Sequence, residues 1–78
     1  MVIKVLGSGC AKCNQLEEAT RSAVAELGID ATVEKVSDLN DIVGYGIMTT
    51  PALVVDEQVK LAGRVPSLDE IKKILQSA

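Results

Sequence analysis

Hydrophobic and polar positions alternate along the chain in patterns that predict its main elements. The run from Val2 to Leu6 is apolar except for Lys4, which is typical of a central strand covered on both faces. A second continuous apolar run, from Ala52 to Val55, predicts another strand. Between them, from Ala11 to Leu27, apolar residues recur at helical spacing opposite a charged face. The pattern therefore indicates strands joined by an amphipathic helix.

The apolar stripe of the 11–27 helix decides which way its first turn faces. The stripe consists of Leu16, Ala19, Ala23, Val24 and Leu27. Continued backward by three residues, it reaches Cys13, so we expect the Cys13 side chain to face the core. Gly28 supplies the usual helix end.

The second half of the chain predicts shorter elements. Residues 29–36 alternate roughly and indicate a half-covered edge strand, which the connecting helix should make parallel to the first. Residues 38–45 indicate a short helix with Ser37 or Asp38 as its cap. Residues 59–61 form a short alternating run that pairs with 52–55 as a β-hairpin, although the turn lacks the glycine that such turns prefer.

The last predicted element is a closing helix. Ser67-Leu68-Asp69-Glu70 is a capping-box sequence, and the apolar residues that follow it share one helix face. The predicted order is therefore β-α-β-α-β-β-α, an α/β fold. A length of 78 residues fits a single domain over 1–78.

Composition narrows the function classes. The formal net charge is −3 and the Lys and Arg residues are scattered, which argues against nucleic acid or an anionic membrane surface as a partner. The N-terminus has no basic leader, and no apolar run approaches the length of a membrane span. We therefore expect a cytoplasmic protein without membrane insertion, and we expect a monomer.

The candidate chemistry lies in Gly7-Ser8-Gly9-Cys10-Ala11-Lys12-Cys13, where the first strand ends and the helix begins. We expect the two glycines to let the backbone turn. At a helix N-terminus, free N–H groups and the helix dipole lower a thiol pKa and favour the reactive thiolate. Cys10 should meet solvent at the first turn, while Cys13 points inward.

These two thiols can perform disulfide exchange. Cys10 would attack a substrate disulfide as the nucleophile, and Cys13 would resolve the mixed disulfide. The Lys12 cation either favours the Cys10 thiolate further or is simply solvated. This chemistry needs no cofactor and no metal.

Rival interpretations of the cysteine pair stay open at this point. A structural disulfide closing four residues contributes about 2 kcal/mol at most. A structural zinc ion needs about four ligands, which two cysteines in a chain without histidine do not supply. Two thiolates can, however, bind soft ions such as Cu(I), Hg(II) or As(III). A redox switch that alters partner binding is a further alternative.

The segment Met48-Thr49-Thr50-Pro51-Ala52 is the second informative motif. Taken alone, Pro51 fits a trans proline at the start of a strand, because few X-Pro bonds are cis. Together with Cys-x-x-Cys opening the first helix and the predicted element order, however, the chain resembles the thioredoxin superfamily. It is most similar to small single-domain thioredoxin-like proteins, also called redox-active disulfide proteins. Their pattern matches residues 7–13, 45–55 and 62–67.

The resemblance implies a dithiol–disulfide oxidoreductase acting on protein disulfides and re-reduced by a donor reductase. It implies a cis Pro51 beside the cysteine pair, with the Thr50 backbone pairing with an extended substrate. It also implies a mixed sheet ordered 2-1-3-4, with helices on both faces and the last two strands antiparallel to the first two. One departure is Lys4, at a position where thioredoxins carry a buried Asp that assists the second cysteine.

Overall fold

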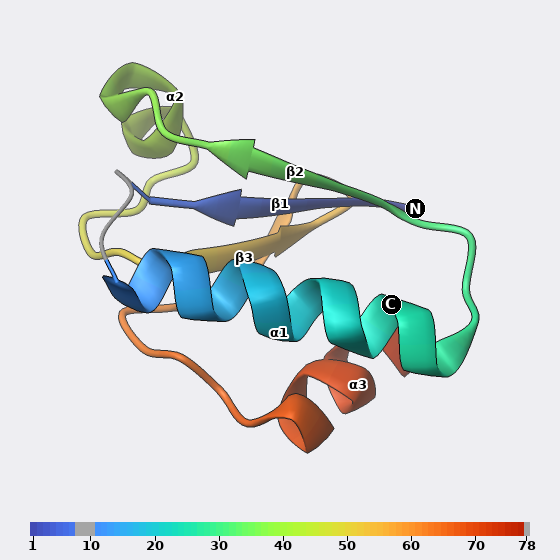
Figure 1. Ribbon diagram of the computed structural model, residues 1–78. Coiled ribbons are helices and arrows are strands. Elements are labelled where there is room, and N and C mark those ends of the chain that lie inside the picture. Colours follow the sequence, from blue (N-terminus) through green and yellow to red (C-terminus); the bar gives the residue numbers. More distant parts are fainter. Residues whose placement is uncertain (8–10, 78) are drawn as a thin grey trace.

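The fold was obtained as a computed structural model, and it describes residues 1–7 and 11–77. The elements along the chain are β1 (Val2–Leu6), α1 (Ala11–Leu27), β2 (Thr32–Val36), α2 (Leu39–Gly44), β3 (Ala52–Val55), β4 (Gln58–Ala62) and α3 (Leu68–Gln76). The four strands form one sheet in the order β2-β1-β3-β4 (Figure 1). The predicted α/β fold class and strand order are confirmed.

Strand directions follow from the connections. β2 pairs parallel to β1, as expected for strands joined by a crossover helix. β3 pairs antiparallel to β1, and β4 pairs antiparallel to β3. β4 therefore runs parallel to β1, and the expectation that both last strands oppose the first two is wrong for β4. The tight hairpin between β3 and β4 reverses the chain and so fixes this direction.

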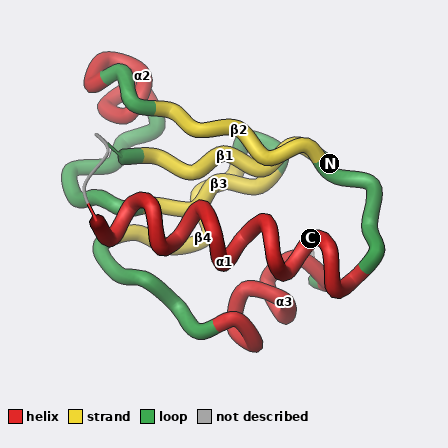
Figure 2. The backbone as a smooth tube through the Cα atoms, in the orientation of Figure 1, coloured by secondary structure: helices red, strands yellow, loops and turns green. Residues whose placement is uncertain are grey.

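Helices cover both faces of the sheet. α1 and α3 lie together over one face, while the short α2 lies at one end of the other (Figure 2). The buried residues on the α1 and α3 side are Ile3, Val5, Leu16, Ala23, Leu53, Val55, Ile71 and Leu75. Those on the α2 side are Leu6, Ile42, Ile47, Ala52 and Val54. Strands β1 and β3 thus contribute side chains to both layers, as continuous apolar runs should.

Helix α1 has the predicted bounds, but its buried stripe includes a residue that the apolar pattern missed. Thr20 is fully buried beside Leu16 and Ala23. Its hydroxyl donates to the Leu16 carbonyl oxygen at 2.7 Å, so this buried hydroxyl has a hydrogen-bond partner. The helix ends at Gly28, whose φ of 64° is left-handed, as predicted for a helix stop.

Strand β2 begins three residues later than the alternation suggested. Its first paired residue, Thr32, lies opposite Val2, the first residue of β1. The Thr32 N–H donates to the Met1 carbonyl oxygen at 3.0 Å. Residues 29–31 have no strand beside them to pair with, so they serve as the connection from α1.

The β3–β4 hairpin turns without glycine. Asp56 and Glu57 take φ values of 48° and 69°, the left-handed pair of a primed two-residue turn. The Asp56 carboxylate offsets part of that strain by accepting the Val2 N–H at 2.8 Å. Beyond the turn the register shifts, so that Lys60 is the extra residue of a bulge between Val59 and Leu61.

The two shorter helices are capped as the sequence predicts. Asp38 caps α2 by accepting the Asn40 N–H at 2.8 Å. Ser67 caps α3 by accepting the Glu70 N–H at 3.2 Å. Arg64 forms an ion pair with Glu70 and ties the preceding loop to α3.

Replacing Ser67 by Ala should lower the free energy of unfolding by about 1 kcal/mol, because an N–H group of the first helical turn loses its acceptor. Chemical denaturation measures the loss. The matched control is Ser22→Ala on the exposed side of α1, where alanine is the better helix former and stability should be unchanged or slightly higher. Equal effects of the two substitutions would contradict the capping role.

Candidate functional site

Three segments meet at one end of the sheet. Leu6, the last residue of β1, pairs with Ala52, and Ala52 pairs with Ala62. The residues just beyond these pairs, Gly7, Pro51 and Gly63, therefore lie at the same edge, where α1 also begins (Figure 1). All three sequence segments that carried the family resemblance contribute to this end.

Cys13 faces the core, as the helical stripe predicted, and is fully buried. Its side chain lies directly against Gly7. A Cβ built on Gly7 would stand 2.2 Å from the Cys13 Sγ and 2.8 Å from its Cβ. Cys10, the predicted nucleophile, lies outside the described residues, as do Ser8 and Gly9.

The structure changes the reason for a glycine at position 7. The sequence suggested that Gly7 lets the backbone turn, yet its φ is not in the left-handed region, unlike those of Gly28, Gly46 and Gly63. Gly7 still continues the sheet, because its N–H donates to the Val36 carbonyl oxygen at 2.9 Å. Its missing side chain makes room for Cys13 instead.

The Thr50–Pro51 peptide bond is cis, as the family resemblance implied. Pro51 is buried, and its carbonyl oxygen accepts the Gly63 N–H at 2.8 Å. Thr50 is exposed, and its backbone N–H and C=O make no hydrogen bond to another backbone group within residues 1–7 and 11–77. An exposed, unpaired peptide unit of this kind can accept an added strand.

An apolar groove of about 740 Å³ opens beside Thr50. Its lining comes from α2 and the loop that follows: Ser37, Leu39, Ile42, Val43, Gly46, Ile47, Met48 and Thr50. Leu39, Val43 and Met48 are 71%, 60% and 98% exposed, so they are not core residues. The sequence pattern predicted only a short helix over residues 38–45 and did not reveal the groove. Two large apolar residues on a helix this short were the available signal.

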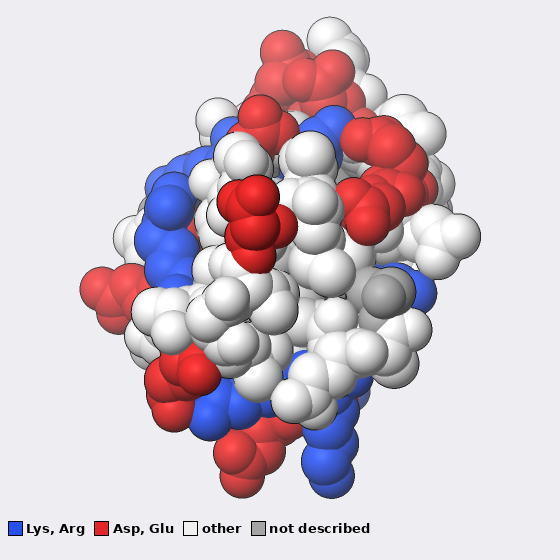
Figure 3. Space-filling model, turned by 90° about the vertical axis from the view of Figure 1, so that its right-hand side faces the viewer, with Lys and Arg blue, Asp and Glu red and all other residues white. Residues whose placement is uncertain are grey.

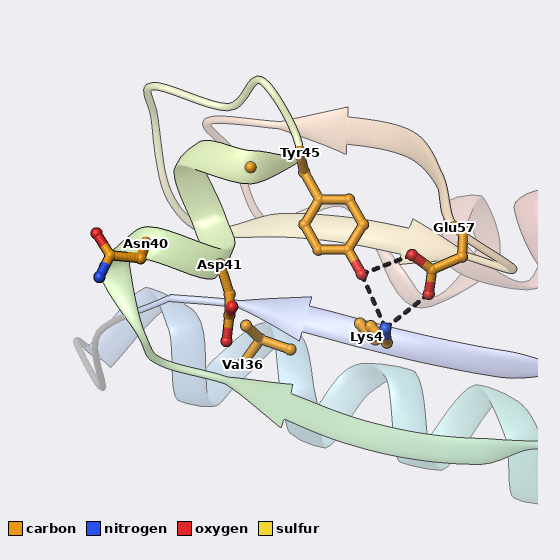
Figure 4. A pocket seen from close by; sticks show the side chains of 7 residues that line it. Lys4, Val36, Asn40, Asp41, Tyr45 and Glu57 are labelled. Atoms are coloured by element: carbon orange, nitrogen blue, oxygen red, sulfur yellow. Dashed lines mark hydrogen bonds and ion pairs between the residues drawn. The ribbon is translucent and has the colours of Figure 1, made fainter.

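A second, polar cleft of about 420 Å³ lies on the same face of the sheet. Figure 4 shows Lys4, Tyr45 and Glu57 joined across it. The Lys4 ammonium donates to Glu57 Oε1 at 2.6 Å and to the Tyr45 hydroxyl at 2.8 Å. The Tyr45 hydroxyl donates to Glu57 Oε2 at 2.8 Å. The cluster links β1 to the end of α2 and to the hairpin turn.

This cluster shifts the titration of its charged members. The hydrogen bond from Lys4, with a second one from Tyr45, lowers the pKa of Glu57 below its ordinary value. The hydrogen bond from Lys4 to Glu57, with a second one from Lys4 to the Tyr45 hydroxyl, raises the pKa of Lys4 above its ordinary value. Lys4 therefore remains a cation at neutral pH. It cannot serve as the proton acceptor that the Asp of thioredoxins provides at this position.

Other surface features add less. Lys12 is exposed in the first turn of α1. Positive and negative side chains are interspersed on the face drawn in Figure 3, without one continuous basic area. No three His, Cys, Asp or Glu side chains gather into a metal-binding group among the described residues. No helix in that part of the chain is long and apolar enough to cross a membrane.

Comparison with known proteins identifies this arrangement. The family described as Thioredoxin domain matches residues 1–76. The chain belongs to the thioredoxin family. It is 49% identical over 75 residues to a thioredoxin of Methanothermobacter thermautotrophicus, covering 96% of this chain and 97% of that protein. It is 44% identical over 77 residues to a thioredoxin of Methanocaldococcus jannaschii, covering 99% of this chain and 88% of that protein.

Family membership gives the reaction class: this thioredoxin-family chain is a dithiol–disulfide oxidoreductase. The arrangement of Cys13, Gly7 and the cis Pro51 at one end of the sheet is compatible with that class.

Replacing Glu57 by Gln should lower stability slightly at neutral pH, because Lys4 and Tyr45 lose a charged partner. A carboxylate whose folded pKa is depressed stabilises above its unfolded pKa, and this stabilisation disappears as the pH falls through the folded value. The difference from wild type should therefore shrink from about pH 7 to about pH 3. Denaturation at both pH values checks this, with Glu18→Gln on the exposed side of α1 as control. A difference that is constant with pH would refute the assignment.

Proposed function

We propose that Cys10 and Cys13 form the redox-active pair, with Cys10 as nucleophile and Cys13 as resolving thiol. The Cys10 thiolate attacks one sulfur of a substrate disulfide, whose other sulfur leaves as a thiolate and takes up a proton from water. The Cys13 thiol gives its proton to water and attacks the Cys10 sulfur, and the second substrate sulfur leaves as a thiolate that takes up a proton from water. The substrate gains two electrons, and the protein is left with a Cys10–Cys13 disulfide.

The observation that carries this proposal is the place of Cys13. It is fully buried at the start of α1 and packs against Gly7, one residue beyond the Leu6–Ala52 pair that leads to the cis Pro51. A buried thiol suits the second step, because it meets only the protein-bound mixed disulfide. Exposed Lys12, in the same helical turn, adds a cation that favours thiolate at this end of α1.

The substrates in this proposal are protein disulfides in an extended segment. The exposed Thr50 backbone, which has no backbone hydrogen bond within the described part of the chain, pairs with that segment as an added strand beside Pro51. The groove beyond Thr50 receives apolar side chains of the same segment. The chain acts as a single domain and monomer in the cytoplasm, and a donor reductase returns the Cys10–Cys13 disulfide to the dithiol.

A Cys13→Ser variant should trap the mixed disulfide, because the resolving step is lost while Cys10 still attacks. Mass spectrometry after incubation with a disulfide-bonded test protein such as insulin should find the substrate attached through Cys10. The Cys10→Ser variant is the control and should form no adduct. Absence of a trapped species, in a preparation whose wild type reduces insulin, would show that the two roles are wrong.

The groove should contribute to the binding of protein substrates and not to the binding of small disulfides. Leu39→Ser with Val43→Ser removes exposed apolar contact, so KM for insulin should rise roughly fivefold to tenfold, equivalent to about 1 kcal/mol of lost burial. Reduction of a small disulfide should not change. Val59→Ser, at another partly exposed apolar residue on β4, is the control. Unchanged KM for insulin would remove the groove from substrate binding.

A further inference from the structure

The proposed chemistry does not explain why position 7 is a glycine. Gly7 lies between the end of β1 and the start of α1, is buried, and is held by its N–H bond to the Val36 carbonyl oxygen. Since its backbone is not left-handed, another residue could adopt the same conformation. The requirement for glycine must come from space.

That space is occupied by the Cys13 side chain. The added Cβ would come within 2.2 Å of Sγ, a distance that rotation about the Cys13 Cα–Cβ bond could relieve. It would also come within 2.8 Å of the Cys13 Cβ, which is fixed by the backbone of α1 and does not move on rotation. An alanine at position 7 therefore forces the first turn of α1 away from the end of β1.

We infer that Gly7 is a positioning residue for the resolving thiol. The Cys13 sulfur packs directly against the Gly7 backbone. This contact sets the position of the sulfur relative to the end of β1. This inference rests on the proposed roles of Cys10 and Cys13. In-line attack on the mixed disulfide needs an accurate sulfur position, and a misplacement of about 1 Å can slow a step by roughly a hundredfold.

The Gly7→Ala substitution should affect the rates of the two chemical steps differently. Attack by Cys10 on a substrate disulfide does not use Cys13, so Gly7→Ala should leave it within about twofold of wild type. The attack of Cys13 on the Cys10 mixed disulfide should slow by roughly tenfold or more. A merely structural role for Gly7 would lower stability without separating the two steps.

Dithiobis(nitrobenzoate) reports both steps in a single turnover of the reduced protein. Attack by Cys10 releases one coloured thiolate, and resolution by Cys13 releases the second. Wild type should release both quickly, and Gly7→Ala should release the first quickly and the second slowly. The matched control is Gly44→Ala, where an added Cβ meets no atom within 4 Å and both steps should keep their wild-type rates.

The outcomes separate this inference from the proposed function. Two fast releases by wild type and by Gly7→Ala alike would overturn the role of Gly7 and leave the proposed function standing. Failure of wild type to release a second thiolate would overturn both.

A stability measurement covers the case in which Gly7→Ala folds poorly. In a Cys13→Gly background both the Sγ and the Cβ that the added Cβ would meet are gone, and only the ordinary contact with the Cys13 Cα at 3.9 Å remains. The loss of unfolding free energy caused by Gly7→Ala should then be at least halved, or the double variant should fold where the single one does not. An equal loss in both backgrounds would contradict direct contact between the two side-chain positions.

Discussion

The pairing of β1 with β3 is the constraint on which the site depends. Its last described pair joins Leu6 to Ala52, and this register sets Gly7 beside Pro51. Gly7 contacts Cys13 at the start of α1, and the Pro51 carbonyl oxygen accepts a hydrogen bond from the Gly63 N–H. Segments distant in sequence thus meet because two buried strands share one register. A slip by one residue would turn the side chains of β3 to the wrong face.

Much of the fold follows from local pattern. The bounds of α1 and β3, and the caps on α2 and α3, came from the spacing of apolar residues and from short polar motifs. The burial of Thr20 was not predicted, because a polar residue is expected at the surface. Its hydroxyl can be buried because it donates to a carbonyl oxygen of its own helix. The start of β2 was misplaced because strand length depends on the partner, and β1 begins only at Val2.

The site was less predictable, for physical reasons. The inward direction of Cys13 followed from helical spacing, but the contact with Gly7 depends on how closely α1 approaches the sheet. The cis bond at Pro51 came from family resemblance, since most X-Pro bonds are trans. Lys4 was read as the loss of an acid. Only three-dimensional proximity shows that it joins Tyr45 to the hairpin carboxylate of Glu57.

The bulge at Lys60 affects how readily the edge strand β4 pairs with another copy of the protein. β4 is an outer strand of the sheet and is largely exposed, so its outward backbone groups form a template for another chain. The shifted register breaks the regular spacing of that template, and it does so at a residue with a long charged side chain. Irregularity and charge together oppose edge-to-edge aggregation. The exposed strand β4 therefore resists pairing with a strand of another molecule.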